Sequence, residues 1–405
     1  MAQGVHTEPV TDWTTDFEIF DEAFRTDPGP IYRELRERAP VAHSDRWGGQ
    51  WLPTRYEDLA TIASDAEHYS SVTVGVTGRK PGEGPLLSAP PITSDPPEHT
   101  ALRRLLLPAF SPKRIEALTG LTRSIARSLI DELRARPDGL GDAAEDYAKH
   151  IPVRVISAML GVPESDEEQF TDWVIRVLQI GPYDFEVGQQ ATKEILAYFE
   201  QKIAERQADP APHDDLLQFL LESTYEDAPL ERKHILGTCF LLLVAGIDTT
   251  WSSIGSSLWH LATHPADRDR LATEPELIPT AIEEFLRVYA PVTMARIVKA
   301  ETTLGGHQLH VGDRVLLPFP AANRDPEVFE DPEEIHIDRK VNRHAAFGLG
   351  VHRCLGSNLA RMELQVAVEE WMRAFPTFEL RQGERVEWTG GQVRGPRTVP
   401  VSLSS

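Results

Sequence analysis

Hydrophobic residues recur at intervals of three and four over most of residues 97–264, which is typical of amphipathic helices. The clearest helical segments are 101–110, 121–135, 153–160, 167–178 and 192–207. The stretch 230–263 is long enough for one continuous helix. Because its middle is apolar on all sides, we expect it to run through the centre of the molecule.

A period of two replaces the helical period in residues 297–319, where turns at Gly305-Gly306 and Gly312-Asp313 predict a small antiparallel sheet. Strand-like stretches also flank Gly48-Gly49, and a final strand is expected at 398–403. Further helices are predicted at 31–38, 281–290 and 357–375. With no repeat and no linker, this pattern indicates one mainly helical α+β domain.

The chain has 405 residues, and its 41 basic and 63 acidic side chains give a net charge of −22. A field of this sign argues against binding to nucleic acid or to an anionic membrane. Two cysteines exclude a disulfide scaffold and indicate a reducing compartment. The first twenty residues carry no signal-peptide pattern, and the longest apolar run, 239–247, is too short to cross a bilayer. We therefore expect a cytoplasmic protein.

The segment 345–361 carries the most distinctive chemistry. Cys354 stands between a Gly-rich loop and the start of the last predicted helix, where backbone N–H groups lower the pKa of a thiol. Gly348, Gly350 and Gly356 remove side chains around it, which would let a flat, bulky group approach the backbone. Phe347 would cover the sulfur with an apolar ring and keep water away.

Four other interpretations apply to Cys354. A lone cysteine is most often a small buried hydrophobic residue. A zinc site formed with His344 and His352 lacks a fourth nearby ligand. A dinucleotide-binding loop is excluded because Arg353 stands where the third glycine belongs. A cysteine nucleophile with His352 as its base has weak geometry, since the two residues are only two apart on a turn.

The run from Phe347 to Gly356, FGLGVHRCLG, resembles the haem-binding loop of the cytochrome P-450 monooxygenases, F-x-x-G-x-x-x-C-x-G, at every fixed position. The resemblance implies that the Cys354 thiolate is the axial ligand of the haem iron. It also implies that Phe347, Gly348, His352 and Gly356 contact haem b. Three further motifs follow the order and spacing of the same family.

The first of these motifs is Glu284-Phe-Leu-Arg287. Residues three apart share a helix face, so the two side chains can pair. Taken alone, such a pair is usually a solvated surface pair. The resemblance instead implies a buried structural trio, completed by Arg339, that braces the haem-binding side and does no chemistry.

The second motif is AGIDTT at residues 245–250. Asp followed by two Thr has a low helix propensity, and burying an unpaired carboxylate in an apolar core costs free energy. The alternative interpretation is therefore a kink in the helix at which the polar side chains are hydrogen-bonded. The resemblance assigns Asp248 and Thr249 to an acid–alcohol pair that delivers protons to bound dioxygen. Ala245 and Gly246, beside the haem, would leave room for oxygen and substrate.

The third motif places His99 and Arg103 four residues apart on a helix introduced by Pro96-Pro97. Two cationic donors on one face suit a pair of carboxylates. The resemblance implies that both bind haem propionates, together with Arg296 and His352. Individually, each of these residues is more often a surface charge.

The resemblance covers essentially the whole chain and implies the cytochrome P-450 fold as a single domain. We expect 1–95 to hold strands and a loop over the pocket, 96–295 to be helical, and 296–405 to hold a sheet, the haem-thiolate loop and the last helix. The implied activity is insertion of one oxygen atom of O2 into a hydrophobic organic substrate. The sequence contains no anchor helix and no fused flavin or iron–sulfur module, which favours the soluble bacterial type.

Electrons are then expected from NAD(P)H only indirectly, through a separate ferredoxin or flavodoxin that docks over the cysteine side. A local basic patch would steer an acidic partner despite the net negative charge. The residues expected in this patch are Arg104, Lys113, Arg114, Arg343 and Arg353.

By family position, substrate contacts are expected from the loop 72–92 and from helices around 166–195. The single residues expected to contact substrate are Val244, Ala245, Val292, Thr293, Met294, Gln392 and Val393. Most are apolar or small, which favours a terpenoid, aromatic, steroid or polyketide. Two alternatives remain: a peroxide-using member of the same fold, which commonly lacks the alcohol, and a haem sensor without turnover.

Overall fold

The computed structural model describes residues 8–78 and 88–403. The α-helices are α1 (Glu22–Thr26), α2 (Gly29–Arg38), α3 (Tyr56–Ser64), α4 (Glu98–Leu106), α5 (Pro112–Glu116), α6 (Thr119–Arg134), α7 (His150–Leu160), α8 (Glu167–Val174), α9 (Phe185–Ala208), α10 (Leu216–Glu222), α11 (Arg232–Thr263), α12 (Pro265–Thr273), α13 (Ile278–Val288), α14 (Phe319–Ala322) and α15 (Ser357–Ala374). Two π-helical segments, η3 (Ala144–Ala148) and η5 (Ile175–Ile180), adjoin α7 and α8.

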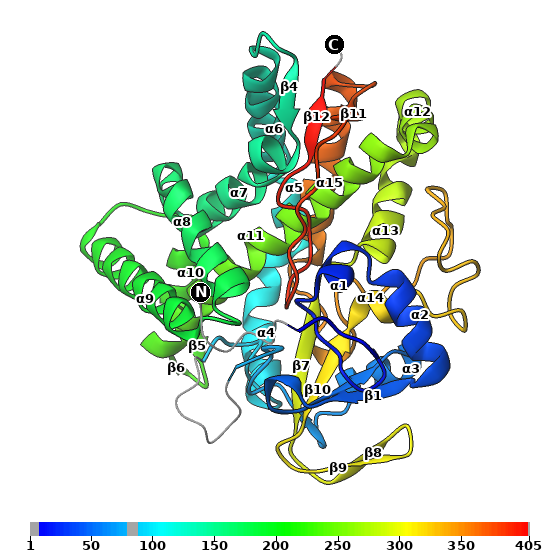
Figure 1. Ribbon diagram of the computed structural model, residues 1–405. Coiled ribbons are helices and arrows are strands. Elements are labelled where there is room, and N and C mark those ends of the chain that lie inside the picture. Colours follow the sequence, from blue (N-terminus) through cyan, green and yellow to red (C-terminus); the bar gives the residue numbers. More distant parts are fainter. Residues whose placement is uncertain (1–7, 79–87, 404–405) are drawn as a thin grey trace.

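Helix α11 forms the central axis of the fold, as its apolar middle predicts, and crosses the molecule between the other helices (Figure 1). It packs against α7, α8, α9, α13 and α15. The helix ends at Thr263 because His264 leaves the helical conformation and Pro265 starts α12. Within residues 8–78 and 88–403, α11 is the one helix long and apolar enough to span a membrane, and most of that stretch is buried inside the protein.

A five-stranded sheet lies beside this helical part, in the order β1 (Val41–Ser44), β2 (Gln50–Pro53), β10 (Arg314–Pro318), β7 (Thr293–Val298) and β3 (Tyr69–Ser70). Strand β10 runs parallel to β2, and the other neighbours are antiparallel. Side chains of β7 alternate between the two faces, so Val292, Met294 and Arg296 share one direction. That direction is towards the cavity described below.

The antiparallel pairing predicted over 297–319 is present, but it is divided between two sheets instead of forming one. The turn at Gly305-Gly306 joins β8 (Thr302–Leu304) and β9 (His307–Leu309) as a separate pair, whereas β10 pairs with β7 and β2. Every residue of β10 is buried, so this strand needs a neighbour on both edges. Strands β8 and β9 bury only one residue each and remain on the surface.

The C-terminal segment returns to the helical part. Strand β12 (Pro400–Ser402), expected from the sequence, lies between β11 (Glu379–Leu380) and β4 (Leu140–Asp142). The coil between β11 and β12 runs past α11 towards α1 (Figure 1). Its Arg394 donates hydrogen bonds to the carbonyls of Arg25 and Thr26, which fixes the coil against the N-terminal part.

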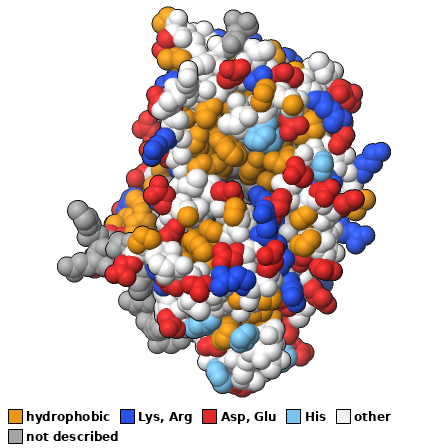
Figure 2. All heavy atoms as spheres, turned by 45° about the vertical axis from the view of Figure 1, so that its right-hand side comes forward, with side chains coloured by type: hydrophobic (Ala, Val, Ile, Leu, Met, Phe, Trp, Pro, Cys, Tyr) orange, Lys and Arg blue, Asp and Glu red, His pale blue; other side chains and the backbone are white. Residues whose placement is uncertain are grey.

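The surface carries both signs of charge despite the net charge of −22. Acidic and basic side chains are intermixed on the face shown in Figure 2, around an apolar area in its upper half. Local basic groups therefore coexist with the overall negative field.

Candidate active site

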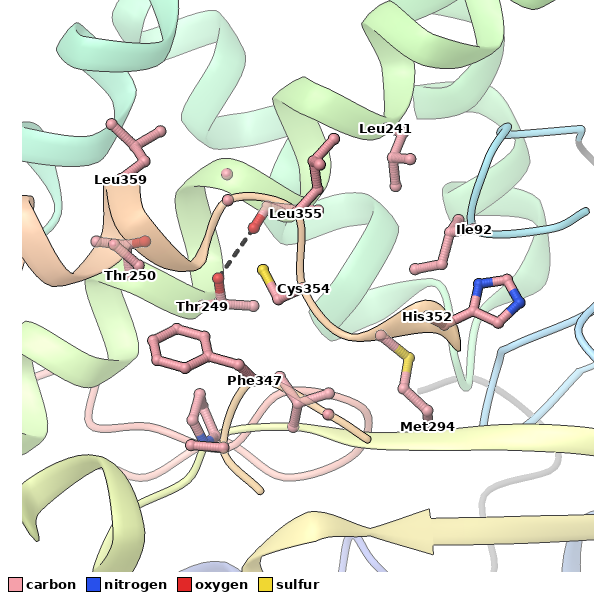
Figure 3. A pocket seen from close by; sticks show the side chains of 18 of the residues that line it. Ile92, Leu241, Thr249, Thr250, Met294, Phe347, His352, Cys354, Leu355 and Leu359 are labelled. Carbon is pink, nitrogen blue, oxygen red and sulfur yellow. Dashed lines mark hydrogen bonds between the residues drawn. The ribbon is translucent and has the colours of Figure 1, made fainter. Parts of the chain in front are cut away.

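The main cavity lies between α11 and the loop that precedes α15, and has a volume of about 220 Å³. Its wall is mostly apolar and includes Ile92, Leu241, Met294, Phe347 and Leu355 (Figure 3). Helices α4, α7, α11 and α15 and strand β7 all contribute to it. The predicted Cys354, Thr249 and His352 meet in this cavity, although they come from distant parts of the sequence.

Cys354 faces the cavity just before α15, which begins after the N-cap Gly356. Its backbone N–H donates to the carbonyl of Phe347 at 2.7 Å, which closes the loop. Burial within the surrounding protein raises the pKa of the thiol, while the N–H of Gly356 and the guanidinium of Arg103 act in the opposite direction. A stable thiolate here therefore requires a further positive charge on the cavity side. A metal ion bound to the sulfur would supply this charge.

The glycines of this loop serve different purposes. Gly348 lines the cavity with a φ of +73°, which favours glycine. Gly350 does not line it. A Cβ at that position would lie 2.0 Å from the carbonyl oxygen of Ala63 at the end of α3. Gly350 is thus required for packing against α3, and the prediction that it makes room for a flat ligand is wrong. Gly356 lines the cavity as expected.

A buried group of potential cations borders the cavity on one side. The rings of His99 and His352 are 4.1 Å apart between centroids, and Nε2 of His352 lies 2.9 Å from Oγ of Ser71. Both ring nitrogens of His99 are buried without a hydrogen-bond partner. His352 lines the cavity, whereas His99 packs behind it.

Arg296 and Arg103 complete this group, and both line the cavity. Arg296 is buried and donates to the carbonyl of Ala295, and Arg103 donates to the carbonyl of Arg353. Burial lowers the pKa of Arg296 to about 10, and the pKa of His352 to about 3. None of the four forms an ion pair within the described part of the chain. The carboxylate of Asp95 does not provide one, because it binds Ser70, Ser71 and Lys299 instead.

These residues fit haem. A thiol faces an apolar cavity, and two arginines and two histidines without an ion pair gather along one border, where two carboxylates would provide the missing anions. Ala245 and Gly246 of α11 also line the cavity as predicted. Gly246 has a second reason to be small, since a Cβ there would lie 3.2 Å from the side chain of Ile156 on α7.

Asp248 and Thr249 point in different directions, as neighbours on a helix do. The hydroxyl of Thr249 lines the cavity and donates to the carbonyl of Ala245 at 2.9 Å (Figure 3). Asp248 is fully buried outside the cavity wall, and its Oδ1 lies 2.7 Å from Nη2 of Arg397. Burial raises the pKa of Asp248, against the opposing effect of Arg397. Arg397 was not expected from the sequence, because it lies in an irregular C-terminal stretch.

The trio of Glu284, Arg287 and Arg339 is assembled behind the loop. Glu284 and Arg287 are both 0% exposed and form a two-bond ion pair with 2.8 Å contacts. Nε of Arg339 reaches both Glu284 oxygens, at 3.0 and 3.1 Å. Asn342 also donates a hydrogen bond to Glu284. Asn323 donates to the carbonyl of Arg287 and accepts a hydrogen bond from the N–H of Ala345. The trio does not line the cavity, so its position suits a bracing function.

Several predicted substrate contacts lie elsewhere. Val292, Met294 and Ala245 line the cavity, but Thr293 points to the other face of β7, and Val244, Gln392 and Val393 lie outside the wall. Gln392 contacts Met294 from behind, with 3.3 Å between Nε2 and Sδ. No residue of 166–195 lines the main cavity. In the loop 72–92, residues 79–87 are outside the described residues, and Val74, Pro91 and Ile92 do line it.

One acidic residue of the cavity was missed. Glu363 of α15 is fully buried and lines the cavity, and one of its oxygens has no hydrogen-bond partner. Burial raises its pKa to about 8, which favours the protonated form of the carboxyl. A sequence signal exists: Glu363 follows Leu359 by four positions and precedes Ala367 by four, which puts a carboxyl on the buried face of the helix.

Comparisons with known proteins agree with this site. The family model described as Cytochrome P450 matches residues 86–392. The mycinamicin IV hydroxylase/epoxidase of Micromonospora griseorubida is 36% identical, over 91% of this chain and 94% of that protein. The structure of the bacillaene polyketide synthase cytochrome P450 PksS of Bacillus subtilis matches with a TM-score of 0.87 and 33% identity, over 96% of this chain and all of that one.

CYP109E1 of Bacillus megaterium in complex with testosterone is also similar, with a TM-score of 0.86, 32% identity and coverage of 94% of this chain and 99% of that one. These matches extend over the helical part, the sheet and the cysteine loop together. The chain therefore belongs to the cytochrome P450 family, as a monooxygenase that uses haem b and O2 to oxidise small hydrophobic molecules with electrons supplied by redox partners.

Proposed function

We propose that Cys354 holds the haem iron and that the substrate is oxidised in the space between it and Thr249. The observation that carries this proposal is the meeting of the Cys354 thiol and the Thr249 hydroxyl in one apolar cavity. When bound, the haem supplies the activation of dioxygen. The protein contributes the thiolate, the binding of the propionates and the delivery of protons.

His99, Arg103, Arg296 and His352 are the proposed propionate partners. Their buried nitrogens lack an anion in the described chain, and two propionates would provide one. Thr249 would pass protons from its hydroxyl within the cavity, and Asp248 would act from behind the helix, since it does not reach the cavity itself. The apolar wall excludes bulk water from this path.

For the substrate, we propose a polyketide or steroid-like compound with a hydrophobic ring system. The cavity wall offers Ile92, Leu241, Leu242, Val292 and Met294, and few polar groups besides those assigned to haem and protons. Relatives named for a polyketide pathway and for a testosterone complex support the same class. Such a ligand gains its affinity from apolar area removed from water.

The experiment is the absorption spectrum of the dithionite-reduced protein with and without carbon monoxide. We expect a strongly red-shifted Soret band in the presence of carbon monoxide, because a thiolate donates electron density to the iron. A band at the position typical of histidine-ligated haem would contradict the assignment of Cys354. The absence of any haem band would contradict the whole proposal.

A ferredoxin is the proposed electron donor, docking near the cysteine loop. Arg104, Lys113, Arg343 and Arg353 are exposed, and no ion pair is formed by their side chains within the described residues. Arg114, the fifth predicted member, pairs with Asp214 at 3.1 Å, which reduces its contribution. Exposed cations without an ion pair favour the local attraction of an acidic partner.

Reversing two of these charges, in Arg104→Glu together with Lys113→Glu, is expected to slow reduction by a ferredoxin about tenfold at low salt and to flatten the salt dependence. The measurement is stopped-flow reduction under carbon monoxide. Lys193→Glu, which reverses one charge at an exposed position of α9, is the control and should leave the rate unchanged. Equal rates in the double variant and the parent would refute the docking site.

A further inference from the structure

A second set of paired charges lies beside the trio of Glu284, Arg287 and Arg339 and reaches the cysteine loop. Arg361 of α15 donates from Nε and Nη2 to the two carboxylate oxygens of Glu283 on α13, at 2.7 and 3.0 Å. Two parallel bonds fix the plane of the guanidinium, because both must form at once. The pair therefore holds the Arg361 side chain in one orientation.

His344 is the third member of this set. Its Nε2 lies 3.0 Å from Oε2 of Glu283, and its Nδ1 accepts a hydrogen bond from the N–H of Ala346 at 3.2 Å. Because Nδ1 is the acceptor, the proton lies on Nε2, and the ring is a neutral donor to Glu283. Within the described residues, Arg361 is therefore the cation that balances this carboxylate.

The guanidinium of Arg361 also covers the ring of Phe347. Its Cζ lies 4.4 Å from the ring centroid, which is the geometry of a cation–π contact. The Phe347 side chain lines the main cavity together with Cys354 (Figure 3). Its carbonyl accepts the N–H of Cys354 at 2.7 Å. A fixed positive charge thus lies behind the aromatic ring of the cysteine loop.

The charge of Arg361 acts on the sulfur. Burial raises the pKa of the Cys354 thiol, and Arg361 is one of the cations that act in the opposite direction. A cation that favours the thiolate also favours an additional electron on an iron bound to it, because both add negative charge at the same place. Glu283 reduces this effect, since its carboxylate lies against the same guanidinium.

We propose that Arg361 and Glu283 set the reduction potential of the haem from their position behind Phe347. This inference rests on the proposed ligation of the iron by Cys354. Neither residue lines the main cavity, so both are positioning residues that act through the loop. Arg361 raises the potential by stabilising the electron that the redox partner delivers, and Glu283 lowers it by balancing that cation.

The test is a spectroelectrochemical titration of the haem-loaded full chain without substrate. Arg361→Gln should lower the equilibrium constant for reduction about tenfold, which is about 59 mV for one electron. Glu283→Gln should raise this constant about threefold, because Arg361 keeps its charge and loses its counter-charge. Arg361→Lys retains the charge without the planar contact to the ring, so its potential should lie closer to that of the parent than the potential of Arg361→Gln does.

Arg373→Gln is the matched control. Arg373 also lies on α15 and pairs with Glu370, but its side chain is 60% exposed, and it is about 18 Å beyond Arg361 along the helix. This variant should have the potential of the parent. Shifts of the same sign in Arg361→Gln and Glu283→Gln would show a merely structural role. Unchanged potentials in both would also overturn the proposal.

The carbon monoxide spectrum separates this proposal from the proposed function. Arg361→Gln and Glu283→Gln should both keep the red-shifted Soret band, because Cys354 is unchanged. Loss of the red shift in these variants alone would contradict the proposal, since the charges would then be needed for ligation rather than for the potential. Absence of the red shift in the parent would instead reject the ligation by Cys354.

Discussion

Glu284→Gln is expected to lower the free energy of unfolding by about 3–5 kcal/mol, because it leaves two buried arginines without an anion. Arg287 is fully buried and Arg339 nearly so, and both take their charge balance from Glu284. Burial alone would raise the pKa of Glu284, but hydrogen bonds from Arg287, the N–H of His336 and Arg339 outweigh it, so the carboxyl stays ionised. The measurement is urea unfolding followed by circular dichroism.

The neighbouring Glu283→Gln provides the matched control. Glu283 also pairs twice, with Arg361 and His344, but it is 28% exposed. Hydrogen bonds from these partners overcome the effect of burial and hold its pKa at about 2. Its stabilising contribution is therefore present at neutral pH and is lost as the pH falls from about 4.5 towards 2. A loss in Glu283→Gln as large as in Glu284→Gln would contradict the special weight given to the buried trio.

Local sequence signals were sufficient wherever one element determines the outcome. The apolar stretch of α11, the helix after Pro96-Pro97 and the Cys354 loop were all predictable, because periodicity and spacing are properties of neighbouring residues. The pairing of β10 with β2 was not predictable in this way. It depends on a strand more than 250 residues earlier in the chain, as the contact between Val315 and Trp51 shows.

The site was predictable to the extent that its residues lie in motifs. Arg397 carries no signal, since its place beside Asp248 comes from the C-terminal coil crossing α11. Glu363 does carry a signal, because its helical spacing from Leu359 and Ala367 places it on the buried face of α15. For Gly350, a glycine near a cysteine does not reveal in the sequence which atom, here the carbonyl oxygen of Ala63, prevents a side chain. Tertiary contacts therefore determine the positions of Arg397 and Gly350, which local patterns do not reveal.

Cys354→Ser is expected to abolish the red shift of the reduced carbon monoxide complex and to reduce NAD(P)H-driven turnover at least about a thousandfold, or about 4 kcal/mol in the activation barrier. Serine occupies nearly the same volume but does not form an anion at neutral pH, so the donor of electron density is lost. The cationic group and the apolar wall are untouched, so haem should still bind.

Cys239→Ser is the control, because it removes the chain's other thiol from the same protein. Cys239 lies in α11, fully buried and away from the cavity wall, and burial raises its pKa to about 12. The variant should retain the red-shifted band and most of its activity, with a modest loss of stability from the buried hydroxyl. Retention of the red shift in Cys354→Ser would show that another group supplies the ligand. Loss of the red shift in both variants would show that the spectrum reports general damage to the fold rather than the Cys354 sulfur.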